Sequence, residues 1–347
     1  MRFYDRQHQF YCGVDLHAKT TYLCILDQSG EIVFHRDVKA NPERFLRALK
    51  PYRDDVVVGA ECMFTWYWLA DLCEAEQIEF ALGHALYMRA IHGGKTKNDH
   101  IDSEKIARML RGGMFPISYV YPKEMRATRD LLRRRTFLMR RRAELLTHLH
   151  NTHLQYNLTP PTGGLGYAAN RVELTKPFDD ESVRKMVQVD ADLVGHFDDQ
   201  LRELELYLTR HAKVDDPNTF YRLQSVPGIG KILALTIMYE VQDIRRFNSV
   251  GQFISYARLV RGSHESGGKS KGSPNKKIGN VHLKWAFSEA VCLFMRECEQ
   301  AKRFVERKSK KHCKAKAMAV LSAKLGRAVY WMLRRETVFD VNKFFAN

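Results

Sequence analysis

The chain has 347 residues, 45% of them hydrophobic, and a formal net charge of +16. Such a chain can bury two or three hydrophobic cores, which excludes a disordered tail. It contains no apolar stretch near the ~20 residues of a membrane-spanning helix and no signal-peptide pattern at its start, so we expect a cytoplasmic protein without a membrane partner. The excess positive charge points to a polyanion, and nucleic acid is the first candidate.

Residues 1–122 predict an α/β domain. Short runs rich in β-forming residues predict strands, and capped amphipathic segments predict helices. The expected strands are Phe10–Asp15, Thr21–Asp27, Glu31–Val38, Val56–Ala60 and Glu79–Leu82, and the expected helices start at Asn41, Thr65 and about His100. Three antiparallel-type strands followed by strand–helix alternation are the order of an RNase H-like (RuvC-like) fold.

Four acidic residues of this domain are candidate catalytic residues and metal ligands. Asp15 and Glu61 each follow an apolar strand, whereas Asp99 and Asp102 lie three apart at a helix start and therefore share a face. Carboxylates in this arrangement can hold two hard divalent cations, for which Mg²⁺ or Mn²⁺ is expected. Two-metal sites break and rejoin phosphodiesters. Taken singly, each acid could be an ordinary turn residue.

Residues 123–215 predict two long helices with apolar residues every seven positions. The first is strongly basic, with nine Lys/Arg against three Asp/Glu between 123 and 150. The pair predicts a coiled-coil-like antiparallel hairpin or a dimerisation arm. The one-sided charge favours nucleic-acid contact over a merely solvated face. The candidate contacts are Arg133, Arg134, Arg140 and Arg141.

Residues 216–347 predict a mainly helical domain. Its segment Leu223–Ala234 has the form of a helix-hairpin-helix, in which a Gly-x-Gly turn lets backbone N–H groups approach a phosphate. An ordinary tight turn is the alternative. A second basic run, residues 302–316, has eight Lys/Arg against one acid and is expected to contact DNA or RNA. The candidate contacts are Gly228, Gly230, Lys231, Lys310 and Lys311.

Between these two segments lies a stretch rich in serine, glycine and lysine, residues 261–280. The residues alone favour a flexible basic loop that contacts phosphates. The alternative makes one serine a nucleophile, with glycines admitting a scissile phosphate and lysines steadying it. The lysines concerned are Lys269, Lys271, Lys276 and Lys277.

The seven cysteines form no C-x-x-C pair, and the 14 histidines form no H-x-x-x-H pair. We therefore expect reduced thiols rather than disulfides, and no zinc site of these patterns.

In this order along the chain, the pieces resemble the DEDD-type transposases of insertion sequences and the related Piv-like DNA invertases. The resemblance covers nearly the whole chain, and the joint presence of the Lys-x-Asp-x-x-Asp and serine–glycine pieces makes it specific. The matching pieces are Gly13-Val14-Asp15, Ala60-Glu61, Lys97-Asn98-Asp99-His100-Ile101-Asp102, Val226-Pro227-Gly228-Ile229-Gly230 and Glu265-Ser266-Gly267-Gly268-Lys269.

The resemblance implies a recombinase with a RuvC-like N-terminal domain and a C-terminal transposase domain. Its site would combine the four carboxylates, with Mg²⁺, and a serine nucleophile. That serine would be Ser266, which precedes the paired glycines; Ser263 and Ser270 are the alternatives.

The partners that it implies are double-stranded donor and target DNA and a non-coding bridge RNA. We expect a dimer, or a tetramer when two duplexes are joined, in a bacterial or archaeal cell and associated with the nucleoid when active. Two rival functions remain open. One is a hydrolytic RuvC-like nuclease such as a junction resolvase, and the other is a non-catalytic nucleic-acid-binding scaffold.

Overall fold

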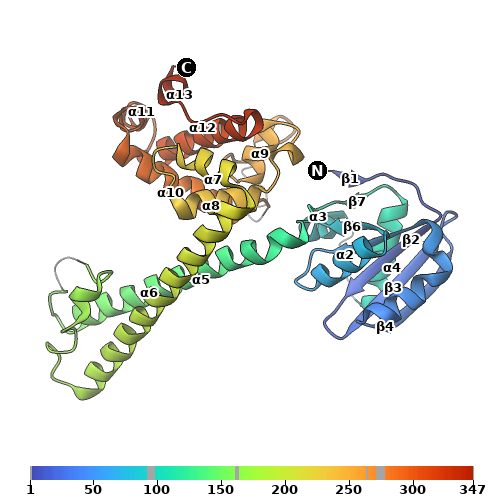
Figure 1. Ribbon diagram of the computed structural model, residues 1–347, viewed down its shortest axis with the longest axis horizontal. Helices are drawn as coiled ribbons and strands as arrows, with labels where there is room; N and C mark the ends of the chain where they lie inside the picture. The colour runs from blue at the N-terminus through green and yellow to red at the C-terminus, as the bar shows by residue number, and fades with distance from the viewer. Residues whose placement is uncertain (1, 92–97, 161–163, 263–264, 271–277, 347) are drawn as a thin grey trace. The chain divides into compact units, whose positions relative to one another are not determined.

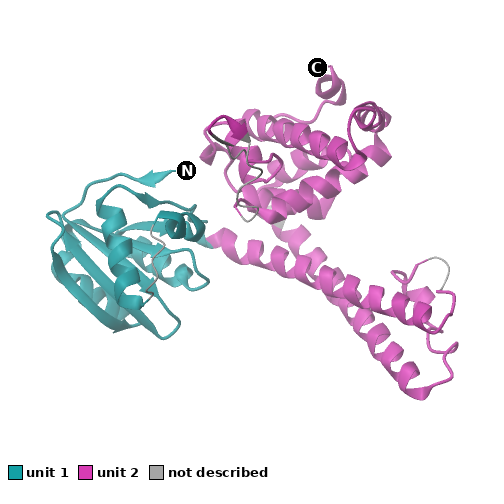
Figure 2. Ribbon diagram, turned by 180° about the vertical axis from the view of Figure 1, so that it is seen from behind, with its two compact units in different colours: residues 1–123 teal, residues 124–347 magenta. Residues whose placement is uncertain are grey.

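The computed structural model describes residues 2–91, 98–160, 164–262, 265–270 and 278–346. The chain forms two compact units, Met1–Lys123 and Glu124–Asn347 (Figure 2). Their division falls one residue from the boundary expected after residue 122. The parts expected at 123–215 and 216–347 belong to one unit.

The first unit is built on a five-stranded mixed sheet with the order β4-β3-β2-β5-β6 (Figure 1). The first three strands along the chain pair antiparallel, and β5 and β6 extend the sheet in parallel. The strands are β2 (Phe10–Leu16), β3 (Thr20–Asp27), β4 (Ile32–Lys39), β5 (Val56–Glu61) and β6 (Glu79–Gly83). All five expected strands are confirmed. A two-residue pair, β1 (Phe3–Tyr4) with β7 (Phe115–Pro116), was not expected.

Helices cover both faces of the sheet. On one face, apolar side chains of β2 and β5 such as Val14 and Val58 pack with α1 (Pro42–Leu49) and α2 (Trp66–Ala75). On the other face, Tyr11 and Val57 pack against α4 (Asp99–Arg111). Because strand side chains alternate in direction, the odd-numbered residues of β2 and β5 face α4. A 3₁₀ helix (Lys50–Asp55) and α3 (Ala85–Ile91) complete the described helices of the unit.

Glycine allows α4 to lie directly on the sheet. A Cβ atom at Gly13 would stand 2.1 Å from the backbone oxygen of Ser103 and 2.4 Å from the backbone nitrogen of Ala107. A Cβ at Gly59 would stand 2.6 Å from Leu110. These close approaches hold α4 against β2 and β5 at Gly13 and Gly59, so the acids at the start of α4 lie over the ends of the two strands.

The second unit begins with two long helices, α5 (Lys123–Gln155) and α6 (Glu181–Asp215). They run antiparallel, as the ion pairs Arg135–Glu205 and Arg142–Asp198 show. The residues expected at heptad spacing on α6, namely Val187, Val194, Leu201 and Leu208, are all buried. The helices therefore form a hairpin within the chain, one of the two arrangements expected for them.

The rest of the second unit is a helical core. Helix α8 (Lys231–Val241) is buried from Leu233 to Val241 and belongs to the main hydrophobic core of the unit. The other helices of this part of the unit are α7 (Pro217–Gln224), α9 (Val250–Tyr256), α10 (Val281–Glu297), α11 (Glu299–Ser309), α12 (Lys314–Arg335) and α13 (Val341–Phe345). Short 3₁₀ helices cover Ala168–Arg171 and Ile244–Arg246, and β8 (Glu265–Ser266) pairs with β9 (Lys269–Ser270). Among the described residues, no helix has both the length and the apolar content to cross a membrane.

Candidate active site

The carboxylates Asp15 and Glu61 stand side by side at the ends of two parallel strands. Strands β2 and β5 are paired up to Val14 and Ala60, and the two acids are the next residues on each strand. They share the sheet face of Gly13 two positions earlier, which is the face covered by α4. Both side chains are partly buried. Register thus brings together two acids that are 46 positions apart in the sequence.

The other two acids occupy the first turn of α4. Asn98 caps this helix, because its side-chain oxygen accepts a hydrogen bond of 2.8 Å from the backbone N–H of Ile101. Asp102 Oδ1 lies 3.4 Å from the ammonium group of Lys105. Asp99 is far more open than Asp15, with 55% side-chain exposure against 19%. The positive end of the helix stabilises both carboxylates.

A histidine that the sequence analysis did not single out joins the two halves of this group. The Nε2 atom of His17 lies 3.3 Å from Asp15 Oδ2 and 3.3 Å from Asp99 Oδ1. That nitrogen is buried and makes no well-oriented hydrogen bond to any residue that the structure describes. His17 follows Asp15 by two positions, and this spacing along the strand direction was the signal available in the sequence.

The electrostatics of the group fit a cation. Burial raises the pKa of Asp15; His17 opposes this rise, while the negative charges of Asp99 and Asp102 add to it. The ligand atoms of Asp15, His17 and Asp99 all lie within 4.8 Å of one another. A divalent cation stabilises neighbouring carboxylates that otherwise repel one another, and the Nε2 atom of His17 has no hydrogen-bond partner among the described residues. These residues therefore fit such an ion.

The candidate serine, Ser266, lies on a tight hairpin. It ends β8 and pairs with Lys269, so Gly267 and Gly268 form the turn. Both glycines have positive φ, 58° and 72°, as a type I′ turn requires. The turn itself therefore explains the paired glycines, in addition to the access for a phosphate that we expected them to provide. Ser270 lies on β9, whereas Ser263, Lys271, Lys276 and Lys277 lie outside the described residues.

The helix-hairpin-helix turn differs from expectation at Gly228. Its backbone N–H donates a hydrogen bond of 2.9 Å to Glu297 Oε2, so a carboxylate already occupies this donor. The residue has φ +85°, and a Cβ there would stand 2.4 Å from the backbone nitrogen of Phe294 on α10. The turn packs on α10 at this point. Gly230 and Lys231 are exposed instead, at the start of α8.

The candidate arginines of α5 divide into two groups. Arg133 donates hydrogen bonds of 2.7 and 3.0 Å to the buried carboxylate of Glu240, which ties α5 to α8. Arg134 and Arg141 are exposed and stack on Phe137, with guanidinium carbons 5.3 and 5.1 Å from the ring centre. Arg140, Lys269, Lys310 and Lys311 are also exposed.

Comparison with known proteins identifies the chain. Residues 12–157 match the family model of the DEDD transposase domain of IS110 elements, and residues 221–306 match the transposase IS116/IS110/IS902 family. The first match spans all four acids and the second spans Ser266.

Two similar proteins are transposases. The transposase for insertion sequence element IS1328 of Yersinia enterocolitica is 27% identical over 253 residues, which cover 71% of this chain and 74% of the relative. The transposase for insertion sequence element IS1111A of Coxiella burnetii is 24% identical over 280 residues, or 78% and 74% of the two chains.

The matches therefore define the class: this is a transposase, an enzyme that acts on DNA. More narrowly, the chain belongs to the DEDD-type insertion-sequence transposases of the IS110 family. A DEDD transposase domain implies the use of a divalent metal.

Proposed function

We propose that this transposase cuts and rejoins DNA strands with the carboxylates of Asp15, Glu61, Asp99 and Asp102 and with Ser266 as the nucleophile. The observation that carries the proposal is the convergence of Asp15, near the end of β2, with His17 and with Asp99 at the start of α4. The strand order, antiparallel across β4, β3 and β2 and parallel through β6, supports an RNase H-like domain.

The four carboxylates are the proposed ligands of Mg²⁺, with Mn²⁺ as the alternative. A bound Mg²⁺ supplies positive charge beside the scissile phosphate and offsets the charge that develops in the transition state. Asp15 and Glu61 contribute rigid ligands because their strands are fixed by the sheet. Asp99 and Asp102 contribute ligands from a helix start that also favours anions. The Nε2 atom of His17 lies 3.3 Å from both Asp15 and Asp99, so it is close enough to serve as a further ligand.

Ser266 is the proposed nucleophile. Its Oγ forms a bond to the phosphorus, the bond from phosphorus to the 3′ oxygen breaks, and the serine proton is balanced by protonation of the leaving 3′ oxygen. The products are a phosphoserine link and a free 3′-hydroxyl. Attack by the 3′-hydroxyl of a partner strand then restores Ser266 and completes strand exchange without ATP.

Nucleic-acid binding is proposed for the exposed basic residues. Lys231 and Gly230 present the start of α8 to a phosphate, whereas Arg134 and Arg141 present a cationic face of α5. We extend the proposal to donor and target duplexes, to a non-coding bridge RNA that selects them, and to a dimer or tetramer that brings them together. The net charge of +16 supports binding of more than one polyanion.

The test is strand cleavage of DNA carrying an end of the element, with RNA transcribed from the adjoining non-coding sequence. Wild type should cleave with Mg²⁺ and not with chelator, and Asp15→Asn should reduce cleavage by at least ~100-fold. The control is Asp199→Asn, whose carboxylate is exposed on α6 and pairs locally with Arg202. Undiminished cleavage by Asp15→Asn would remove the metal site from the mechanism. Metal-independent DNA binding without cleavage would favour the scaffold.

A further inference from the structure

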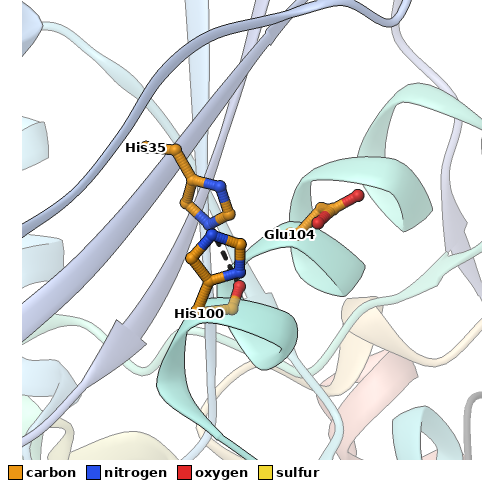
Figure 3. Close-up of side chains that lie close together, drawn as sticks. All are labelled: His35, His100 and Glu104. Carbon is orange, nitrogen blue, oxygen red and sulfur yellow. Dashed lines mark hydrogen bonds between the residues drawn. The ribbon is translucent and has the colours of Figure 1, made fainter.

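A second group of potential ligands lies on the outer part of the first unit. It comprises His35 on β4 and His100 and Glu104 on α4, as Figure 3 shows. One ligand atom from each residue lies within 4.8 Å of the others. His100 and Glu104 are four residues apart and so share a helix face. The group is assembled from a strand and a helix 65 residues apart, which is why no H-x-x-x-H pattern marks it in the sequence.

The two imidazoles are held in place by their neighbours. Their ring centres are 3.6 Å apart with planes tilted by 36°, and the ring of Tyr22 packs against both. The Nε2 atom of His35 lies 3.1 Å from the backbone oxygen of His100. Ser103 Oγ donates to the same oxygen at 3.0 Å. A carbonyl partner assigns the proton of His35 to Nε2, which leaves the Nδ1 lone pair for a ligand.

The third donor is also oriented. Arg108 Nε donates a hydrogen bond of 2.7 Å to Glu104 Oε1, and the carboxylate is only 24% exposed. A neutral imidazole is the form that coordinates metals, and the hydrogen bond to the His100 carbonyl suits a neutral His35 ring protonated at Nε2. An anionic oxygen beside two imidazoles provides one negative charge for a divalent ion.

The chemistry of the donors distinguishes this group from the carboxylate site. Two nitrogens and one oxygen suit Zn²⁺, Co²⁺ or Ni²⁺, whereas Mg²⁺ prefers oxygen ligands alone. His100 is exposed, so water has access to a fourth position. The hydrogen bonds that orient His35 and Glu104 would serve as the supporting partners that a metal site requires.

We propose that His35, His100 and Glu104 form a binding site for a zinc-like divalent cation, separate from the catalytic carboxylates. The ion would join β4, an edge strand, to the first two turns of α4. Asp99 and Asp102 lie on the same turns, so the ion would steady the helix that carries half of the carboxylates. The site is independent of the proposed cleavage chemistry, because none of its three residues belongs to the catalytic set.

The experiment is a titration of the full-length, metal-free protein with Co²⁺, followed by its visible ligand-field absorption and then by displacement with Zn²⁺. We expect wild type to bind one Co²⁺ in this way, and we expect His35→Gln and His100→Asn each to weaken binding by at least about 10-fold. Asp15→Asn should leave the signal unchanged, as should His196→Gln, which alters a histidine of α6.

Thermal denaturation with and without Zn²⁺ provides a second readout. Zn²⁺ should raise the melting temperature of wild type and of Asp15→Asn, and should not raise that of His35→Gln or His100→Asn. Absence of a Co²⁺ spectrum in wild type would overturn the proposal. Equal Co²⁺ affinity of wild type, His35→Gln and His100→Asn would also overturn it. Loss of the signal in Asp15→Asn alone would assign the ion to the catalytic carboxylates instead.

Discussion

Replacing Glu240 by glutamine should lower the free energy of unfolding of the helical unit by about 3 kcal/mol at neutral pH. The Glu240 side chain is 3% exposed and accepts hydrogen bonds from Arg129 and Arg133 on α5 and from Asn280 before α10. The carboxylate therefore joins three segments of the unit, including the long basic helix. Glutamine keeps the shape of the side chain and removes the charge.

The magnitude follows from the pKa of Glu240. Burial raises this pKa, but the hydrogen bond from Arg133, the charges of both arginines and the hydrogen bond from Asn280 outweigh burial and lower it from 4.5 to about 2. This lowering of the pKa corresponds to roughly 3 kcal/mol. Because the folded-state pKa is lowered, this stability is fully present above pH 4.5 and is lost as the pH falls towards 2. About 1 kcal/mol should remain at about pH 3.

The assay is urea unfolding of wild type and Glu240→Gln, followed by circular dichroism at pH 7 and pH 3. The difference in unfolding free energy should shrink between the two pH values. The control is Glu144→Gln, whose carboxylate is 61% exposed and pairs with Arg141 on the same helix. It should change stability by less than about 0.5 kcal/mol. Equal stability of wild type and Glu240→Gln at pH 7, or an equal deficit at both pH values, would show that the charge of Glu240 does not stabilise the unit.

Three further predictions concern positions where the backbone or the charge is constrained. Gly228→Ala should destabilise the protein by about 3 kcal/mol or more in thermal denaturation, because Gly228 has a positive φ and its new Cβ would meet the backbone of α10. Gly230→Ala should cost less than about 1 kcal/mol, because no described atom lies within 4 Å of a Cβ at that position. Equal melting temperatures for the two variants would contradict this. Gly13→Ala should lower the free energy of unfolding by about 3 kcal/mol and reduce Mg²⁺-dependent cleavage, because the new Cβ would push α4 away from the sheet. The control is Gly195→Ala on α6, where the new Cβ would meet no described atom, and it should raise the free energy of unfolding by up to about 1 kcal/mol. Asp15→Asn should melt at a higher temperature than metal-free wild type at pH 7. The pKa of Asp15 is raised in the folded protein, so its negative charge opposes folding at a pH above that pKa. This opposition disappears as the pH falls and the carboxyl group is protonated. Mg²⁺ should raise the melting temperature of wild type but not that of Asp15→Asn. A variant that melts at a lower temperature than wild type without metal would contradict the view that the charge of Asp15 opposes folding.

Local signals in the sequence were sufficient for most of the elements of the first unit. Alternation and β-forming residues predicted β2 to β6, and Asn41 caps α1 as expected. The carboxyl ends of parallel strands meet at one edge, so Asp15 and Glu61 could be grouped from the strand pattern alone. The mixed sheet and the mostly helical second unit confirm the coarse fold.

Contacts that depend on register or on distant segments were not predictable in the same way. The approach of His35 to His100 requires the pairing of β3 with β4 and the docking of α4 on glycines. The hydrogen bond from Gly228 to Glu297 joins residues 69 positions apart, and no local pattern distinguishes it from a free phosphate-binding turn. The Ser266 hairpin was expected as a flexible loop, because two adjacent glycines fit either a loop or a type I′ turn.

The most direct test of the central claim is the covalent protein–DNA adduct. Wild-type protein, labelled DNA carrying an element end, the RNA and Mg²⁺ should give an adduct that survives denaturing electrophoresis, with the label on a phosphoserine peptide at Ser266. Ser266→Ala and Asp15→Asn should each abolish the adduct, and Ser270→Ala, altered four residues away on β9, should retain it. Cleavage by Ser266→Ala at the wild-type rate, with water in place of a protein link, would contradict the serine nucleophile and identify a hydrolytic nuclease.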